Sequence, residues 1–212
     1  MARTPKQQPE YWPEACAHLS QQDAVLAELI TTYPDSILTG RGDAFFTLAR
    51  AIVGQQISVK AADSIWARFE AQLGSVHPHT ILDSHHDDLR AVGLSGQKVT
   101  YLNEIATHAA NGRLNVEDWH SWDDEAVIKE LVKIKGIGRW TAEMFLIFNM
   151  LRPDVFPLSD LGLKLAMHKH YNGGEKPESD AFYSDISQNW GPYRTVATWY
   201  LWRSLDPVEV VY

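Results

Sequence analysis

Residues 131–160 read LVKIKGIGRWTAEMFLIFNMLRPDVFPLSD. Apolar side chains recur at helical spacing before Gly136-Ile137-Gly138, and those after it cover a second helix nearly all round. Glycine accepts backbone angles that other residues resist, so two glycines one residue apart allow a very tight reversal. The stretch therefore predicts two helices joined by a tight turn, with the second helix in the centre of the domain.

This predicted turn is suited to binding an anion. A helix that begins there leaves backbone N–H groups unpaired near Gly138, and such a nest typically binds a phosphate oxygen. Lys133, Lys135 and Arg139 lie around it, and segment 131–152 has a net charge of +3. The alternative interpretation is an ordinary helical hairpin whose glycine turn binds nothing.

The composition indicates a globular chain, because 45% of the 212 residues are hydrophobic. The formal net charge of −8 argues against a general DNA-binding surface. The charge is unevenly placed, however, since segment 115–125 carries −5 whereas segment 39–68 carries +2. The two glycine-containing stretches that could contact DNA are therefore locally basic.

Several classes of site are disfavoured by the residue types present. The single cysteine, Cys16, excludes an internal disulfide and a four-cysteine iron–sulfur cluster. The N-terminal sequence has prolines and polar residues where a signal peptide needs an apolar core. We therefore expect a cytoplasmic protein, in the bacterial cytoplasm or nucleoid. Four histidines fall in one stretch, which we interpret as a solvated loop before a short helix rather than a metal site: His77, His79, His85 and His86.

The rest of the chain shows helical periodicity and no persistent two-residue alternation, which predicts an all-α protein. Residues 1–11 are expected to be a loose tail. Predicted helices cover about 21–32, 45–53, 57–69, 97–110, 178–189 and 192–203, with Pro192 in the first turn of the last. His168 and His170 are expected on the exposed face of a helix. The expected N-terminal signals are Ser20 with Asp23, Ser95, Ser121 with Asp124, and Ser159.

The combined pattern is longer than a glycine turn. L-x-x-I-K-G-I-G-x-x-T-A is followed by an apolar helix and then by V-F-P-x-S-D, which ends at Asp160. This resembles the helix-hairpin-helix DNA glycosylase superfamily over residues 36–205. GIGRWTAE and WGPYRTVATWYLW are most similar to the alkylbase, 3-methyladenine-type DNA glycosylase II enzymes. The resemblance implies one glycosylase unit with two lobes, 44–150 and 1–43 plus 151–212, and a DNA-binding cleft between them.

The resemblance implies a catalytic role for Asp160, although a carboxylate that caps a helix is common for aspartate at such a position. A fixed carboxylate would stabilise the oxocarbenium-like sugar that forms when the glycosidic bond breaks. Trp140, Met144 and Trp202 match positions that line the base pocket. Relatives that also cleave the strand have a lysine where Trp140 stands, so no lyase activity is expected.

The resemblance also assigns residues that would contact DNA. Gln56, in I-V-G-Q-Q-I-S-V-K-A-A, matches the wedge that fills the gap left by a flipped nucleotide, although a glutamine pair at a helix junction is often simply solvated. The backbone contacts would come from Gly136, Gly138, Lys135 and Arg139. No cofactor is implied to be required. A structural Na⁺ or K⁺ would be bound by the main-chain carbonyls of Val132, Ile134 and Ile137.

We therefore expect a monomeric, monofunctional glycosylase that excises alkylated purines such as 3-methyladenine and 7-methylguanine from double-stranded DNA in base excision repair. Two alternatives remain open at this point. A noncatalytic helix-hairpin-helix module could bind DNA or sense damage with the same turn. A helical protein with no DNA role would suit the net charge.

Overall fold

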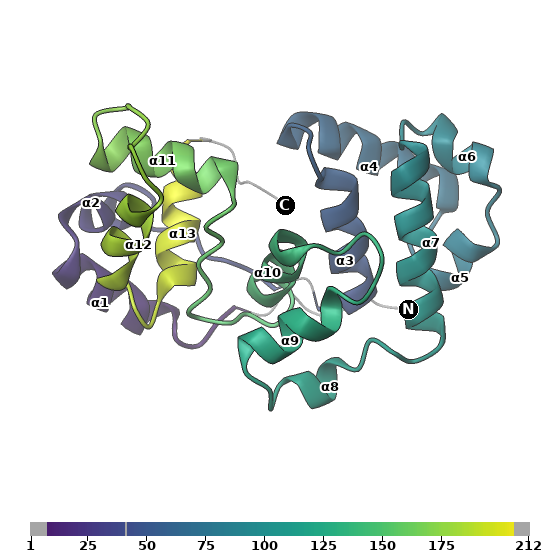
Figure 1. Ribbon diagram of the computed structural model, residues 1–212, viewed down its shortest axis with the longest axis horizontal. Coiled ribbons are helices and arrows are strands. Elements are labelled where there is room, and N and C mark those ends of the chain that lie inside the picture. The colour runs from purple at the N-terminus through teal and green to yellow at the C-terminus, as the bar shows by residue number, and fades with distance from the viewer. Residues whose placement is uncertain (1–7, 41, 206–212) are drawn as a thin grey trace. The chain divides into compact units, whose positions relative to one another are not determined.

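The computed structural model describes residues 8–40 and 42–205, and within them the regular structure is entirely helical (Figure 1). The expectation of an all-α fold is confirmed. Among the described helices, none is both long and apolar enough to cross a membrane.

The described residues form two compact units, one made of residues 42–145 and the other of 8–40 with 146–205. The two lobes expected from the sequence, with boundaries at residues 43 and 150, stay a prediction. In the first unit, α3 packs against both α4 and α7, and α7 also contacts α5 and α6. Its helices are α3 (Ala44–Gly54), α4 (Val59–Leu73), α5 (Pro78–Leu82), α6 (His86–Ala91), α7 (Gly96–Ala110), α8 (Val116–Trp119), α9 (Asp124–Leu131) and the larger part of α10 (Arg139–Phe148).

The second unit is arranged around its last helix. α13 (Arg194–Arg203) contacts α1 (Trp12–Gln22), α2 (Ala24–Thr32) and α11 (Leu161–Tyr171), and α12 is Ala181–Gln188. Every side chain of α13 from Thr195 to Trp202 is buried. A helix that is buried on all sides occupies the centre of its unit, so the sequence of α13 determines how the surrounding segments pack.

Three predicted capping residues are wrong by one to three positions, and the reason is the same each time. Asp23 caps α2, Asp123 caps α9 and Asp160 caps α11, each accepting from a backbone N–H group of the first turn. The sequence favours caps at Ser20, Ser121 and Ser159, although it also allows Asp160 as a cap. Serine and aspartate are both good caps, and the carboxylate that lies at the real helix start takes the role. By contrast, the cap at Ser95 is confirmed, since its hydroxyl accepts from the Lys98 N–H.

Other local expectations also need correction. Residues 12–22 form α1, so the expected helix start near residue 21 lies at the end of another helix. The last helix, α13, begins two residues after Pro192 rather than containing it. His168 and His170 are only partly exposed, because they form hydrogen bonds with Tyr183 and Ser204. The stretch with four histidines contains α5 and α6. No group of three or more metal-binding side chains occurs in the part of the chain that the structure describes.

Candidate active site and DNA-contact turn

The predicted hairpin is present: α9 ends at Leu131 and α10 begins at Arg139. Gly136 has φ +98°, and a Cβ there would lie 2.2 Å from Cγ of Tyr101, so no other residue fits. Gly138 is exposed, and a Cβ placed on it would have no neighbour within 4 Å. Gly136 is thus required by packing, whereas Gly138 leaves the N-terminus of α10 open to an approaching ligand.

The charges around the turn are largely paired. Nε of Arg139 donates to Oε1 of Glu143 at 2.9 Å, and its Nη1 donates to Oε2 of Glu125 at 3.1 Å. These two carboxylates raise the pKa of Arg139 above its usual range, and the hydrogen bond with Glu125 has the larger effect. Lys133 forms an ion pair with Glu130. Arg139 therefore joins α9 to α10, and the basic segment is partly balanced by acidic residues N-terminal to it. Its contact with DNA stays a prediction.

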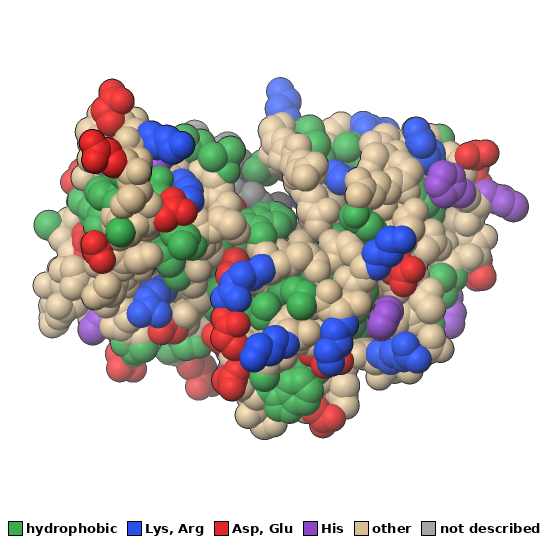
Figure 2. All heavy atoms as spheres, in the orientation of Figure 1, with side chains coloured by type: hydrophobic (Ala, Val, Ile, Leu, Met, Phe, Trp, Pro, Cys, Tyr) green, Lys and Arg blue, Asp and Glu red, His purple; other side chains and the backbone are tan. Residues whose placement is uncertain are grey.

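Basic and acidic side chains are interspersed on the face that Figure 2 shows, without a continuous basic surface. Lys133 and Lys135 are both exposed lysines inside the turn itself, and Lys133 is the one paired with Glu130. The main-chain carbonyls of Val132, Ile134 and Ile137 also belong to the turn, and the Ile134 carbonyl accepts the Ile137 N–H at 3.0 Å. Each carbonyl oxygen has two lone pairs, so this donor set is compatible with a hard cation.

In the second unit, the structure places Asp160 at the N-terminus of α11 with its carboxylate held on two sides. Oδ1 accepts the Leu163 N–H at 2.6 Å and the Trp202 indole N–H at 2.8 Å. The residue is only 6% exposed. The helix-capping interpretation is therefore correct, and it is compatible with a catalytic one, because the same contacts fix the direction of the carboxylate.

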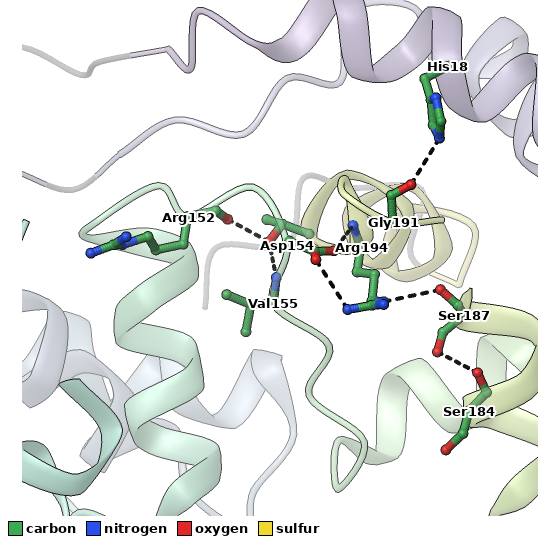
Figure 3. Close-up of polar contacts among 9 residues, drawn as sticks. His18, Arg152, Asp154, Val155, Ser184, Ser187, Gly191 and Arg194 are labelled. Carbon is green, nitrogen blue, oxygen red and sulfur yellow. Dashed lines mark hydrogen bonds and ion pairs between the residues drawn. The ribbon is translucent and has the colours of Figure 1, made fainter. Parts of the chain in front are cut away.

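The segment that leads to Asp160 is attached to the first turn of α13. The Thr195 hydroxyl donates to the Arg152 carbonyl at 2.6 Å and accepts the Val155 N–H at 3.0 Å. Figure 3 shows the Arg194 guanidinium between Asp154 and the Ser187 carbonyl, with each of these hydrogen bonds 3.2 Å long. One end of α13 thus holds the approach to Asp160, and Trp202, two turns further on, holds its carboxylate.

The three residues expected to line the base pocket lie in different surroundings. Trp202 is 2% exposed and stacks on Phe148 with centroids 6.1 Å apart, and its N–H is directed at Asp160. Met144 is 2% exposed, so it is a core side chain in this structure. Trp140 is partly exposed. The sequence interpretation missed the Trp202–Asp160 hydrogen bond, as well as Phe148, Arg194 and Thr195. The only signal for Arg194 and Thr195 was the resemblance of residues 190–202, and no sequence signal indicated that Phe148 stacks on Trp202.

Gln56 lies in the exposed loop between α3 and α4 and has φ +60°. A non-glycine residue in this region costs on the order of 1–3 kcal/mol and persists only where its surroundings enforce it, and such residues cluster at functional sites. No sequence pattern indicates this backbone conformation. Gln56, Trp140 and the hairpin belong to the first unit, and Asp160 and Trp202 belong to the second.

These features, a helix-hairpin-helix turn followed by a capped and buried aspartate, define a class of DNA repair protein. Residues 49–192 match the model of the HhH-GPD superfamily of base excision DNA repair proteins. The match covers more than half of the chain, which therefore belongs to this superfamily.

Within it, the chain is similar to proteins named for 3-methyladenine. It is 32% identical to DNA-3-methyladenine glycosylase 1 of Schizosaccharomyces pombe over 84% of this chain and 80% of the yeast protein. It is 33% identical to a putative DNA-3-methyladenine glycosylase of Bacillus subtilis, covering 75% of this chain but only 58% of the Bacillus protein. The solved structure of an S. pombe 3-methyladenine DNA glycosylase in complex with abasic DNA has a TM-score of 0.80, with 32% identity over 90% of this chain and 96% of that chain.

Proposed function

We propose that this protein is a monofunctional DNA glycosylase that flips alkylated purines out of duplex DNA and hydrolyses their N-glycosidic bond in base excision repair. The observation that carries the proposal is the Asp160 carboxylate, fixed by Leu163 and Trp202 in a chain of this superfamily. Similarity to the 3-methyladenine glycosylases of yeast and Bacillus supports the choice of substrate.

In the proposed reaction, the bond between C1′ and the base nitrogen breaks and its electron pair leaves with the base. Positive charge then develops on the sugar, and the Asp160 carboxylate stabilises it by preorganised electrostatics. A water oxygen forms the new bond to C1′ and releases a proton. The target base must first leave the stack, because its glycosidic bond is otherwise unreachable.

The proposed substrates are 3-methyladenine and 7-methylguanine, which are cationic and have weakened glycosidic bonds. They need little protonation on leaving, and the sequence offers no evident general acid beside Asp160. The partly exposed Trp140 ring would attract a cationic base by cation–π interaction, worth roughly 0.5–2 kcal/mol. That is too little to reject normal purines, so selectivity would come mainly from bond lability and easier extrusion. Neutral lesions such as uracil and hypoxanthine should be released weakly or not at all.

Lesion-containing duplex DNA would bind through the first unit. The open N–H groups at Gly138, together with Gly136 and Lys135, are the proposed phosphate contacts, and Gln56 is the proposed wedge. Arg139 would act indirectly, by fixing α10 through its pairs with Glu125 and Glu143. A monovalent cation at the Val132, Ile134 and Ile137 carbonyls would strengthen the phosphate contact. We also propose that the protein works as a cytoplasmic monomer.

The deciding experiment is chromatography of free bases released from methylated genomic DNA, run beside duplexes that contain uracil or hypoxanthine. We expect release of 3-methyladenine and 7-methylguanine. Release of uracil alone would remove the alkylbase assignment. If duplex DNA binds but no base is released, the second candidate, a noncatalytic damage-sensing module, takes its place.

The same reaction tests the absence of lyase activity. Trp140 stands where a lyase needs an amine, so borohydride added during turnover should trap no covalent protein–DNA adduct. A strong adduct would show that another lysine attacks the sugar.

A further inference from the structure

The loop that carries Gln56 is tied to the hairpin turn by its preceding residue. The side-chain nitrogen of Gln55 donates to the Gly136 carbonyl at 3.1 Å and to the Thr141 hydroxyl at 2.9 Å. A carbonyl only accepts, so the amide must present its NH₂ group to Gly136. All of these residues lie in the first unit. The contact spans more than eighty positions in the sequence and joins the end of α3 to the turn and to α10.

The backbone of the same loop is also held by Lys98, on α7. Its ammonium group donates to the Val53 carbonyl at 2.8 Å and to the Gln55 carbonyl at 2.9 Å. These oxygens lie at the C-terminal end of α3, where carbonyls lack helical partners and a positive charge is favourable. Burial lowers the pKa of Lys98, so its charge is held there at a cost in solvation.

These contacts therefore hold the residue that directly precedes the strained position of Gln56. Its backbone has φ +60° and its side chain is exposed, whereas the side chain and carbonyl of Gln55 are both engaged. The hairpin is also enclosed by the Tyr101 ring beside Gly136. The Gln56 loop and the hairpin turn are in this way joined through Gln55 within one unit.

We infer that Gln55 is a positioning residue that sets the Gln56 wedge in fixed register with the hairpin turn, with Lys98 supporting it from α7. This inference rests on the proposed function. If the turn binds a phosphate while the Gln56 wedge is held at a set distance from the turn, the two can contact DNA at the same time only when the duplex is distorted. The free energy of phosphate binding at the turn then favours extrusion of the base. A wedge on a loose loop would let the turn bind undistorted DNA equally well.

Variants of the two glutamines test this coupling. The measurements are single-turnover release of a methylated purine from duplex and from single-stranded oligonucleotide, and fluorescence of 2-aminopurine beside the lesion, which reports unstacking without excision. Gln55→Ala should slow release from the duplex about tenfold, the factor expected for lost hydrogen bonds to a part-buried partner. Release from the single strand should change little. Gln55→Ala/Gln56→Ala should be no slower than Gln56→Ala, because Gln55 acts through Gln56.

Thr141 provides a matched control from the hairpin side. Thr141→Val keeps the shape and removes one acceptor of the Gln55 amide, and Thr141→Ser restores it. We expect Thr141→Val to reduce duplex unstacking in the same direction as Gln55→Ala, and Thr141→Ser to recover it, with no loss of affinity for undamaged duplex in either variant.

Three results would overturn the inference: equal losses on duplex and single strand, losses of Gln55→Ala and Gln56→Ala that multiply, or a Thr141→Val variant with normal unstacking. A failure of the proposed function is distinguishable from these. In that case the unsubstituted protein releases no methylated purine from either substrate, whereas its 2-aminopurine signal still reports whether the wedge depends on Gln55.

Discussion

The hairpin turn and the Asp160 segment are held in place by different means. The turn depends on a missing side chain at Gly136, on the Tyr101 ring and on the Gln55 amide. Asp160 depends instead on a backbone N–H of its own helix and on an indole N–H from α13. The first arrangement fixes the backbone that we propose to contact phosphate, and the second fixes one charged side chain. Substitutions in the two regions should therefore fail in different ways, one in binding and the other in chemistry.

The largest effect is expected at the carboxylate. Asp160→Asn keeps the size of the side chain and an oxygen for the Leu163 and Trp202 donors but removes the negative charge. We expect single-turnover excision to fall on the order of a thousandfold, the scale of losing a preorganised electrostatic contact at a developing charge. Affinity for a lesion duplex should be nearly unchanged in a binding titration. Excision close to normal would remove Asp160 from the reaction.

The two hairpin glycines should separate stability from binding. Gly136→Ala places a methyl group against Tyr101 at a positive φ, and we expect a loss of about 2 kcal/mol or more in the free energy of unfolding. Gly138→Ala meets no neighbour, so its unfolding free energy should stay within about 0.5 kcal/mol of the parent.

The affinity for duplex DNA is the second quantity that should distinguish the Gly136 and Gly138 variants. The methyl group of Gly138→Ala would crowd the N–H groups at the start of α10, so it should weaken duplex affinity several-fold while leaving the folded state intact. Denaturant unfolding and duplex titration on both variants measure the two effects. If Gly138→Ala binds duplex normally, the turn is an ordinary helical hairpin after all.

A smaller effect is expected from the indole donor. Trp202→Phe can retain stacking on Phe148 while removing the N–H that holds Asp160. A hydrogen bond to a charged group contributes about 1.5–3 kcal/mol, so the single-turnover rate should drop roughly ten- to a hundredfold at unchanged duplex affinity. Phe148→Leu serves as the control, since it disturbs the stack and leaves the N–H in place. Equal losses in the two variants would mean that packing, not the hydrogen bond, supports the rate.

The contrast between the two regions also explains what the sequence could predict. Gly136, Gly138 and the apolar helix after them are local signals, so the hairpin and its all-α surroundings were predictable. The helix caps are Asp23, Asp123 and Asp160 rather than the expected serines, because serine and aspartate compete as caps when they lie a few residues apart. The Trp202–Asp160 and Gln55–Gly136 contacts join residues far apart in the chain. No periodicity reveals such pairs, and only the folded structure brings them together.

The smallest effect concerns Cys16, which lies on α1 with its sulfur 3.5 Å from the Tyr200 hydroxyl on α13. Burial raises the pKa of this thiol, so at a given pH near 8 it has less thiolate than a free cysteine. We expect iodoacetamide to react with it several-fold more slowly than with a model thiol, and the rate to keep rising with pH where the model thiol levels off.

The same thiol can report on the second unit. Gly136→Ala strains the first unit only, so it should leave the Cys16 labelling rate unchanged in native buffer. Trp202→Phe alters α13 itself and should raise the rate slightly, by less than about fivefold if the free energy of opening the unit falls by under about 1 kcal/mol. Mass-spectrometric labelling time courses measure both. Faster labelling in Gly136→Ala than in Trp202→Phe would show that the strain at the hairpin reaches α13, and the two regions would then have to be treated as one cooperative structure.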